Sequence, residues 1–234
     1  MTDFFREVDE EVRRDRLIQF WIRHQSRLIG LAVLIVVATA AWQLYSRHRL
    51  EEQEAAGARY EAAAKLSREG KSSEAAAAFE ALSKTAPKGY AGLARLRAAA
   101  ARAANEPGSA IKAYESLADD PSLEPRLRDF AKLRAAMLRV DRDDPLDFEK
   151  KYASLAADSF PYHHQMRELL GLAALKRNAF DAAGRWFDSI VSDPEAPVGT
   201  SMHAQALLGL VRSASAIPGG VKHEEPPSSG SPAK

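Results

Sequence analysis

Residues 169–194 read LLGLAALKRNAFDAAGRWFDSIVSDP, and this stretch decides the fold. Its apolar residues recur at the three- and four-residue spacing of a helix on both sides of one short break. Gly171 and Ala183 are small enough to let two helices approach closely, and Phe187 fills the groove beside them. Pro194 ends the second helix, because proline cannot continue a helical hydrogen-bond ladder. The stretch therefore predicts a tightly packed helical hairpin.

The same landmarks occur four times in the chain. The second helix of each unit carries an aromatic residue, at separations of 35, 38 and 35 residues: Phe79, Tyr114, Tyr152 and Phe187. Three residues later comes a large aliphatic residue: Leu82, Leu117, Leu155 and Ile190. A proline follows each aromatic residue by seven to nine positions: Pro87, Pro121, Pro161 and Pro194. Alanine precedes most of them by four positions, at Ala75, Ala110 and Ala183, whereas the third unit has Phe148 there.

A period near 34 residues with these landmarks in this order resembles the tetratricopeptide repeat. The chain is rich in alanine and lacks the alternation expected of strands, so we predict an all-α fold of antiparallel hairpins. A generic helical bundle with coincidental spacing is the alternative. The repeat domain is expected over residues 47–216, with four repeats and a capping helix, followed by a disordered tail over 217–234. The expected helices are 48–69, 72–85, 89–104, 108–119, 125–141, 145–157, 162–177, 179–192 and 199–215.

Residues 28–46 contain no charged side chain and predict a transmembrane helix. At about 1.5 Å per residue, a run near twenty residues matches the roughly 30 Å hydrocarbon core of a bilayer. Trp42 and Tyr45 fall at the far end, where aromatic rings favour the headgroup layer. The leader before the span, residues 1–27, has apolar residues at helical spacing and predicts an amphipathic helix, with a partly ordered polar leader as the alternative.

Cleavage as a secretion signal is the alternative to anchoring. Ala38-Thr39-Ala40 has the small-x-small form of a signal-peptidase site, but the apolar run continues past it and the leader carries many acidic residues. Basic residues are only slightly more numerous before the span than after it, so the positive-inside rule weakly favours a cytoplasmic N-terminus. The chain has no cysteine, which fits either side of the membrane.

The sequence offers no recognisable catalytic or cofactor motif, and we expect no enzyme activity, metal or cofactor. Gly70-Lys71-Ser72 lacks the earlier glycine and preceding strand of a phosphate-binding loop. His163 and His164 are adjacent, so on a helix they should point about 100° apart and not hold a metal together. The net charge of +1 argues against nucleic acid as the main partner.

The expected binding surface is the concave groove of the repeats. Arg95, Arg102, Lys132 and Arg139 would form a basic strip for acidic segments or a terminal carboxylate. The alternative is that they are simply solvated helix faces. Aligned to the repeat, the groove positions are Tyr60, Arg95, Arg102, Lys132, Arg139, Glu168 and Leu172.

The leader Phe5–Arg14 (FREVDEEVRR), one span and four alanine-rich repeats together resemble the ancillary SecYEG translocon subunit family (YfgM-like). The resemblance implies an inner-membrane protein with a cytoplasmic N-terminus and a periplasmic repeat domain. It further implies protein partners, namely translocon subunits, periplasmic chaperones and emerging secretory proteins, and no small-molecule substrate. A membrane-tethered scaffold for envelope assembly or division is the alternative, since fold alone does not separate the two roles.

Overall fold

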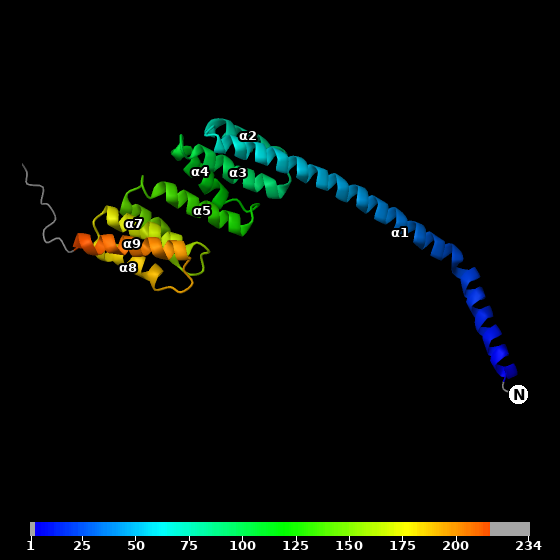
Figure 1. Ribbon diagram of the computed structural model, residues 1–234. Coiled ribbons are helices and arrows are strands. Elements are labelled where there is room, and N and C mark those ends of the chain that lie inside the picture. The colour runs from blue at the N-terminus through cyan, green and yellow to red at the C-terminus, as the bar shows by residue number, and fades with distance from the viewer. Residues whose placement is uncertain (1–2, 216–234) are drawn as a thin grey trace, which may run out of the picture. The chain divides into compact units, whose positions relative to one another are not determined.

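The computed structural model describes the backbone of residues 3–215 and the side chains of residues 25–214 other than 28 and 88. Over these residues the chain is helical and contains no strand, which confirms the all-α prediction (Figure 1). The expected tail, 217–234, lies outside the described residues. The helices are α1 Asp3–Arg68, α2 Ser72–Thr85, α3 Lys88–Arg102, α4 Pro107–Ala118, α5 Pro125–Arg139, α6 Pro145–Tyr152, the 3₁₀ helix η1 Ala153–Ala156, α7 His163–Lys176, α8 Phe180–Val191 and α9 Val198–Ser215.

Helix α1 is longer than the sequence predicts. The expected break between the apolar span and a first repeat helix at 48–69 is absent, because no proline precedes Pro87 and nothing else there interrupts the helical hydrogen bonds. The helix ends where Gly70 takes a left-handed backbone with φ of 77°. The amide of Lys71 then donates to the carbonyl of Leu66 at 3.0 Å, as expected for a glycine-terminated helix. The chain divides into two compact units after Ala58, within α1.

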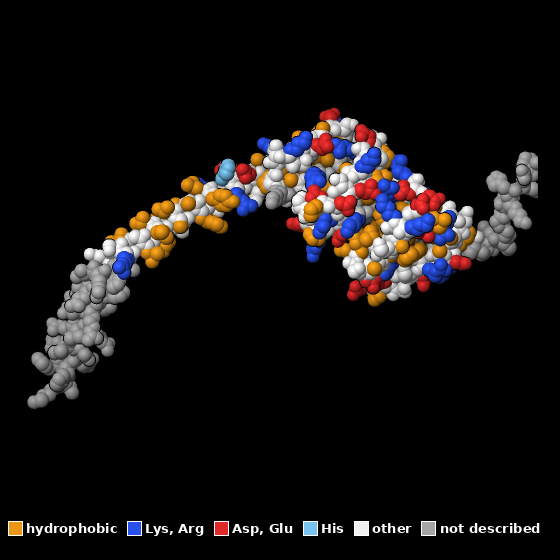
Figure 2. Space-filling view, turned by 180° about the vertical axis from the view of Figure 1, so that it is seen from behind, with side chains coloured by type: hydrophobic (Ala, Val, Ile, Leu, Met, Phe, Trp, Pro, Cys, Tyr) orange, Lys and Arg blue, Asp and Glu red, His pale blue; other side chains and the backbone are white. Residues whose placement is uncertain are grey.

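Part of α1 is long and apolar enough to cross a membrane, within its stretch Gln25–Arg68. The side chains of residues 29–46 in the apolar span are exposed, with exposed fractions from 52% at Ile35 to 72% at Trp42 among the large hydrophobic residues. Figure 2 shows these side chains as a band on the helix, whereas charged groups of both signs cover the repeats. An uncovered band of this kind is typical of a surface that meets another apolar medium.

The landmark residues form the core of the repeats. The four aromatic side chains at the repeated position are at most 5% exposed, and the alanines four residues before them are fully buried: Phe79, Tyr114, Tyr152, Phe187, Ala75, Ala110 and Ala183. Helix α3 packs against α4, and α7 packs against α8. Side chains of α5, α6 and α7 share one core cluster, and the ring of Phe79 on α2 lies against that of Tyr60 near the end of α1. Helix α9 packs against α8 and closes the last core cluster. The repeat pattern therefore predicts the packing correctly.

The third hairpin departs from the expected helix over 145–157. Helix α6 ends at Tyr152 and continues as η1 to Ala156. Phe148, which replaces the usual alanine, is buried with its ring centroid 4.7 Å from that of Tyr152. The Nε of Arg167 donates to the carbonyl of Ala156 at 3.0 Å. This bond satisfies a backbone group that a longer helix would have bonded internally, so the early end of the helix is stabilised.

In the fourth hairpin, Gly171 confirms the role that its small size predicts. A Cβ atom at this position would lie 2.5 Å from Cε1 of Phe187, closer than real Cβ contacts come. Glycine therefore lets the ring of α8 lie directly on the backbone of α7. Asn178, with φ of 59°, ends α7 in a left-handed conformation, and the amide of Ala179 donates to the carbonyl of Ala174 at 2.9 Å.

Candidate functional site

The four cations of the expected basic strip each face a carboxylate of the same chain. Arg95 lies 2.5 Å from Asp120, and Lys132 lies 2.8 Å from Asp129. Arg102 pairs with Glu80, and Arg139 pairs with both Glu115 and Asp143. An acidic partner would therefore have to compete with these intrachain carboxylates. Binding of an acidic partner at the basic strip stays a prediction, and these intrachain ion pairs make such binding less favourable.

Two arginines of the strip and a third, Arg177, form the same kind of ion pair between successive repeat units. The arginine at the end of a first helix pairs with a glutamate on the second helix of the preceding unit. The pairs are Arg102 with Glu80, Arg139 with Glu115, and Arg177 with Glu149. A cation also suits the negative end of a helix dipole. The signal was present in the sequence, because Glu80 and Glu115 directly follow the landmark aromatics and their arginines are 37 residues apart.

The electrostatics of these pairs are consistent with their geometry. Burial alone would raise the pKa of Glu115, but hydrogen bonds from Lys151 and Arg139 hold it below its usual value. Hydrogen bonds from the Ser122 hydroxyl and from Arg95 lower the pKa of Asp120 to about 2. Both carboxylates therefore remain ionised at neutral pH. The pairs stabilise the stacking of the repeats, and they neutralise most of the positive charge of the basic strip.

Replacing Arg139 with methionine should destabilise the repeat domain by about 1 kcal/mol, because Glu115 and Asp143 lose a shared, partly buried donor. The measurement is thermal or urea unfolding of the full chain in detergent, followed by circular dichroism. Lys150→Met is the matched control, since the side chains of Lys150 and Asp147 are 76% and 74% exposed. Equal stability of the two variants would contradict the structural role assigned to Arg139.

The other three expected groove residues have structural contacts as well. The hydroxyl of Tyr60 accepts a hydrogen bond from Nε of Arg97 at 2.9 Å, which links α1 to α3. Glu168 pairs with Nδ1 of His203 on α9 at 2.7 Å. Leu172 is partly buried between the cores of the third and fourth hairpins. Helix α9 therefore contacts the groove positions of the last repeat.

An exposed stripe on the first helices was missed by the sequence reasoning. Helix α3 buries residues on most of its sides but leaves Leu93 and Arg97 exposed, one turn apart. Helix α5 has Phe130 and Arg134 at the same positions 37 residues later, followed by Met137. The exposed fractions are 41% for Leu93, 36% for Phe130 and 44% for Met137. We call these five residues, Leu93, Arg97, Phe130, the half-buried Arg134 and Met137, together with the half-buried Tyr60 of the expected groove, the first-helix face.

The arginines of the first-helix face are held by aromatic groups rather than by carboxylates. Besides the bond of Arg97 to Tyr60, the guanidinium of Arg134 lies 5.9 Å from the ring centroid of Tyr114. The ring of Phe130 packs edge-on against Tyr162 at 6.0 Å. Aromatic, methionine and arginine side chains are the types enriched where proteins bind one another. The 37-residue spacing of these exposed residues was the sequence signal that could have revealed them.

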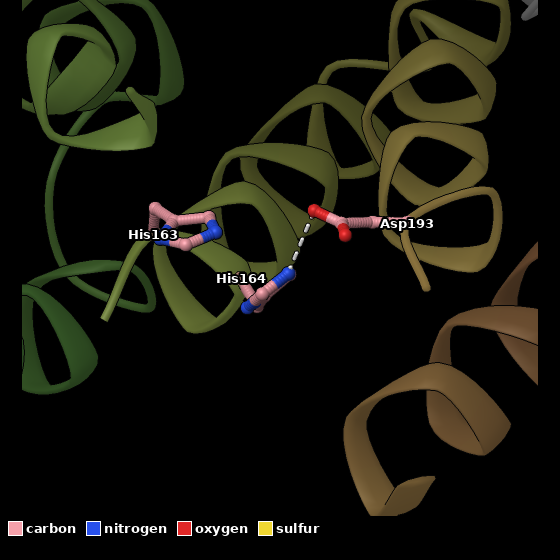
Figure 3. A group of neighbouring side chains, drawn as sticks. All are labelled: His163, His164 and Asp193. Carbon is pink, nitrogen blue, oxygen red and sulfur yellow. Dashed lines mark hydrogen bonds and ion pairs between the residues drawn. The ribbon is translucent and has the colours of Figure 1, made fainter. Parts of the chain in front are cut away.

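A second cluster joins His163, His164 and Asp193, which lie at the ends of the α7–α8 hairpin (Figure 3). The expectation that the two histidines diverge is wrong, because their ring centroids are 3.9 Å apart. His163 begins α7, and its Nδ1 donates to the carbonyl of Phe160 at 2.8 Å, which turns the ring along the helix end. Nε2 of His164 lies 3.0 Å from Oδ2 of Asp193.

Comparison with known protein families identifies the repeats. The family model of the tetratricopeptide repeat-like domain matches residues 18–191. The match starts before the apolar span and runs to the end of α8, so it covers about three quarters of the chain. No curated protein and no solved structure gives a significant match.

Proposed function

The chain belongs to the tetratricopeptide repeat-like domain family, and from this premise we propose that it is a membrane-anchored module that binds protein segments at its first-helix face. Family membership makes protein–protein interaction the best-supported role, since domains of this kind typically act as non-catalytic interaction modules. The observation that carries the binding site is the repeated pair of an exposed apolar residue and an arginine one turn later, Leu93 and Arg97 on α3 and Phe130 and the half-buried Arg134 on α5.

The first-helix face suits an amphipathic or extended protein segment. Leu93 and Phe130 supply apolar contact at neighbouring repeats, and the flexible thioether of Met137 adapts to different side chains. Arg97 and Arg134 are positioned by aromatic groups, so their remaining donors can bond a partner's carbonyl or carboxylate. Such a surface would hold varied segments with moderate affinity rather than one ligand of fixed shape.

Introducing Glu at Leu93 and Met137 should reduce partner capture at least tenfold, because it places charge where apolar contact is expected. Both side chains are more than 40% exposed, so the fold should tolerate the change. The readout is recovery of cross-linked protein from membranes expressing the full chain. Leu146→Glu is the matched control, since Leu146 is 51% exposed on the second helix α6. Capture unaffected by the double change would remove the first-helix face from consideration.

Anchoring by the uncleaved span is supported by two observations. The apolar side chains of the span are uncovered, and the family match begins ten residues before it and continues through Ala38-Thr39-Ala40. A removable signal would not be expected inside the matched domain. N-terminal sequencing of the membrane-bound protein tests this step: the native leader supports the anchor, and a new terminus after Ala40 would overturn it.

The location and partners follow from the resemblance to the ancillary translocon subunits. We place the leader in the cytoplasm and the repeats in the periplasm of the inner membrane. There the first-helix face would meet translocon subunits, periplasmic chaperones or emerging secretory segments. Protease treatment of spheroplasts should degrade the repeats, whereas a protected repeat domain would reverse the orientation. Pull-down from mild detergent separates the roles: channel subunits support the translocon, and division or cell-wall factors support the scaffold alternative.

A further inference from the structure

We propose that His163, His164 and Asp193 form a binding site for one divalent transition-metal ion, with zinc as the best fit. One ring nitrogen from each histidine and one oxygen of Asp193 lie within 4.8 Å of one another. His164 is only 6% exposed, and the side chain of His163 is 14% exposed. The three groups come from the start of α7 and from the residue that follows the C-cap of α8.

The hydrogen bonds of both histidines leave each ring with a nitrogen that can ligate a metal ion. Because the carbonyl of Phe160 can only accept, Nδ1 of His163 carries a proton, and Nε2, 4.0 Å from Oδ1 of Asp158, offers its lone pair to a metal in the neutral ring. A second-shell bond of this kind commonly orients metal-binding histidines. Nε2 of His164 donates to Asp193 in the present state, and metal binding would release that proton.

One ligand–ligand distance in the cluster is close to that of a tetrahedral zinc site. Ligands about 2.0–2.1 Å from zinc lie about 3.3 Å apart. Nε2 of His164 and Oδ2 of Asp193 are 3.0 Å apart, so this edge already has nearly the right length. Two imidazoles and one carboxylate favour zinc over calcium or magnesium, which prefer oxygen ligands. Water would complete the fourth position.

The surrounding charges act in both directions. Asp193 is ionised, because the amide of Glu195 and the His164 ring lower its pKa, and the negative end of α8 also favours a cation. Arg167 opposes the metal, since its guanidinium lies 3.4 Å from Oδ2 of Asp193. That contact is its longest, however, because Arg167 is held by Asp158 and by the carbonyl of Ala156. The arginine can therefore stay in place while Asp193 turns to the metal.

Zinc titration of the purified, tag-free full chain in detergent, against a chromophoric chelator, tests the site. We expect one zinc ion per chain, with affinity reduced at least tenfold by Asp193→Asn and by His163→Gln. His203→Gln is the control, because that histidine pairs with Glu168 outside the cluster. Both cluster variants should retain wild-type helicity by circular dichroism.

Zinc should also raise the melting temperature of the wild-type chain, because the ion would join the two ends of the α7–α8 hairpin. This rise should be absent in Asp193→Asn. A wild-type chain that binds no zinc stoichiometrically would overturn the site without reference to any variant. Equal zinc affinity in the wild type, Asp193→Asn and His163→Gln would overturn it as well.

Discussion

Replacing Leu34 and Val37 together with arginine is expected to move the chain from the membrane to the soluble fraction. The nine leucine, isoleucine and valine residues of the span each contribute about −0.3 to −0.6 kcal/mol to insertion, or roughly −3 to −5 kcal/mol together. Two central arginines would add about 5–7 kcal/mol and reverse the sign. Both native side chains are more than 60% exposed, so the substitution removes no internal contact of the repeats.

Alkaline carbonate extraction of membranes measures the outcome. The wild-type chain should stay in the pellet, and the double-arginine chain should appear in the supernatant with its helicity retained. Leu34→Ala with Val37→Ala is the control, because it shortens the same side chains without adding charge. A double-arginine chain that resists extraction as the wild type does would show that the span is not the anchor.

Gly171→Ala should destabilise the repeat domain by about 1–2 kcal/mol, although alanine is the better helix former by about 1 kcal/mol. The added Cβ would meet Cε1 of Phe187 at 2.5 Å, and two further ring atoms lie within 3.0 Å. The ring cannot retreat, because Phe187 is completely buried between α7, α8 and α9. Overpacking of a closed core therefore outweighs the gain in helix propensity.

Gly209→Ala is the matched control for this change. Gly209 also lies inside a helix, but nothing approaches the position of its added Cβ within 4 Å. That variant should be stabilised by up to about 1 kcal/mol. Urea unfolding of both full-length variants should therefore give opposite signs. Stabilisation of both would mean that the fourth hairpin does not depend on the close approach at Gly171.

The sequence predicts the repeats well because their packing depends on local, periodic choices. An aromatic residue recurs on each second helix, with an alanine four positions earlier in three of the four units, and these side chains lie in the core as expected. The early C-terminal end of α6, at Tyr152, could not be predicted in this way. It depends on Arg167, which bonds a carbonyl eleven residues earlier once the hairpins have stacked.

The candidate site was harder to predict, because it depends on contacts between hairpins. From the sequence, Arg139 looks free to bind a partner. The fold, however, brings Glu115, 24 residues earlier in the chain, into hydrogen-bonding contact with it. The rings of His163 and His164 likewise converge only because a backbone carbonyl holds one of them. Exposed apolar residues at a 37-residue spacing were visible in the sequence, but their exposure was not.

Site-specific photo-cross-linking in living cells tests the central claim most directly. A photoreactive amino acid would replace either Leu93 on the first-helix face or Leu146 on α6, two exposed leucines of the same repeat domain. Irradiation should give protein adducts from position 93, isolated with the membranes, and few or none from position 146. Adducts of equal yield at both positions, or none at position 93, would contradict a protein-binding first-helix face.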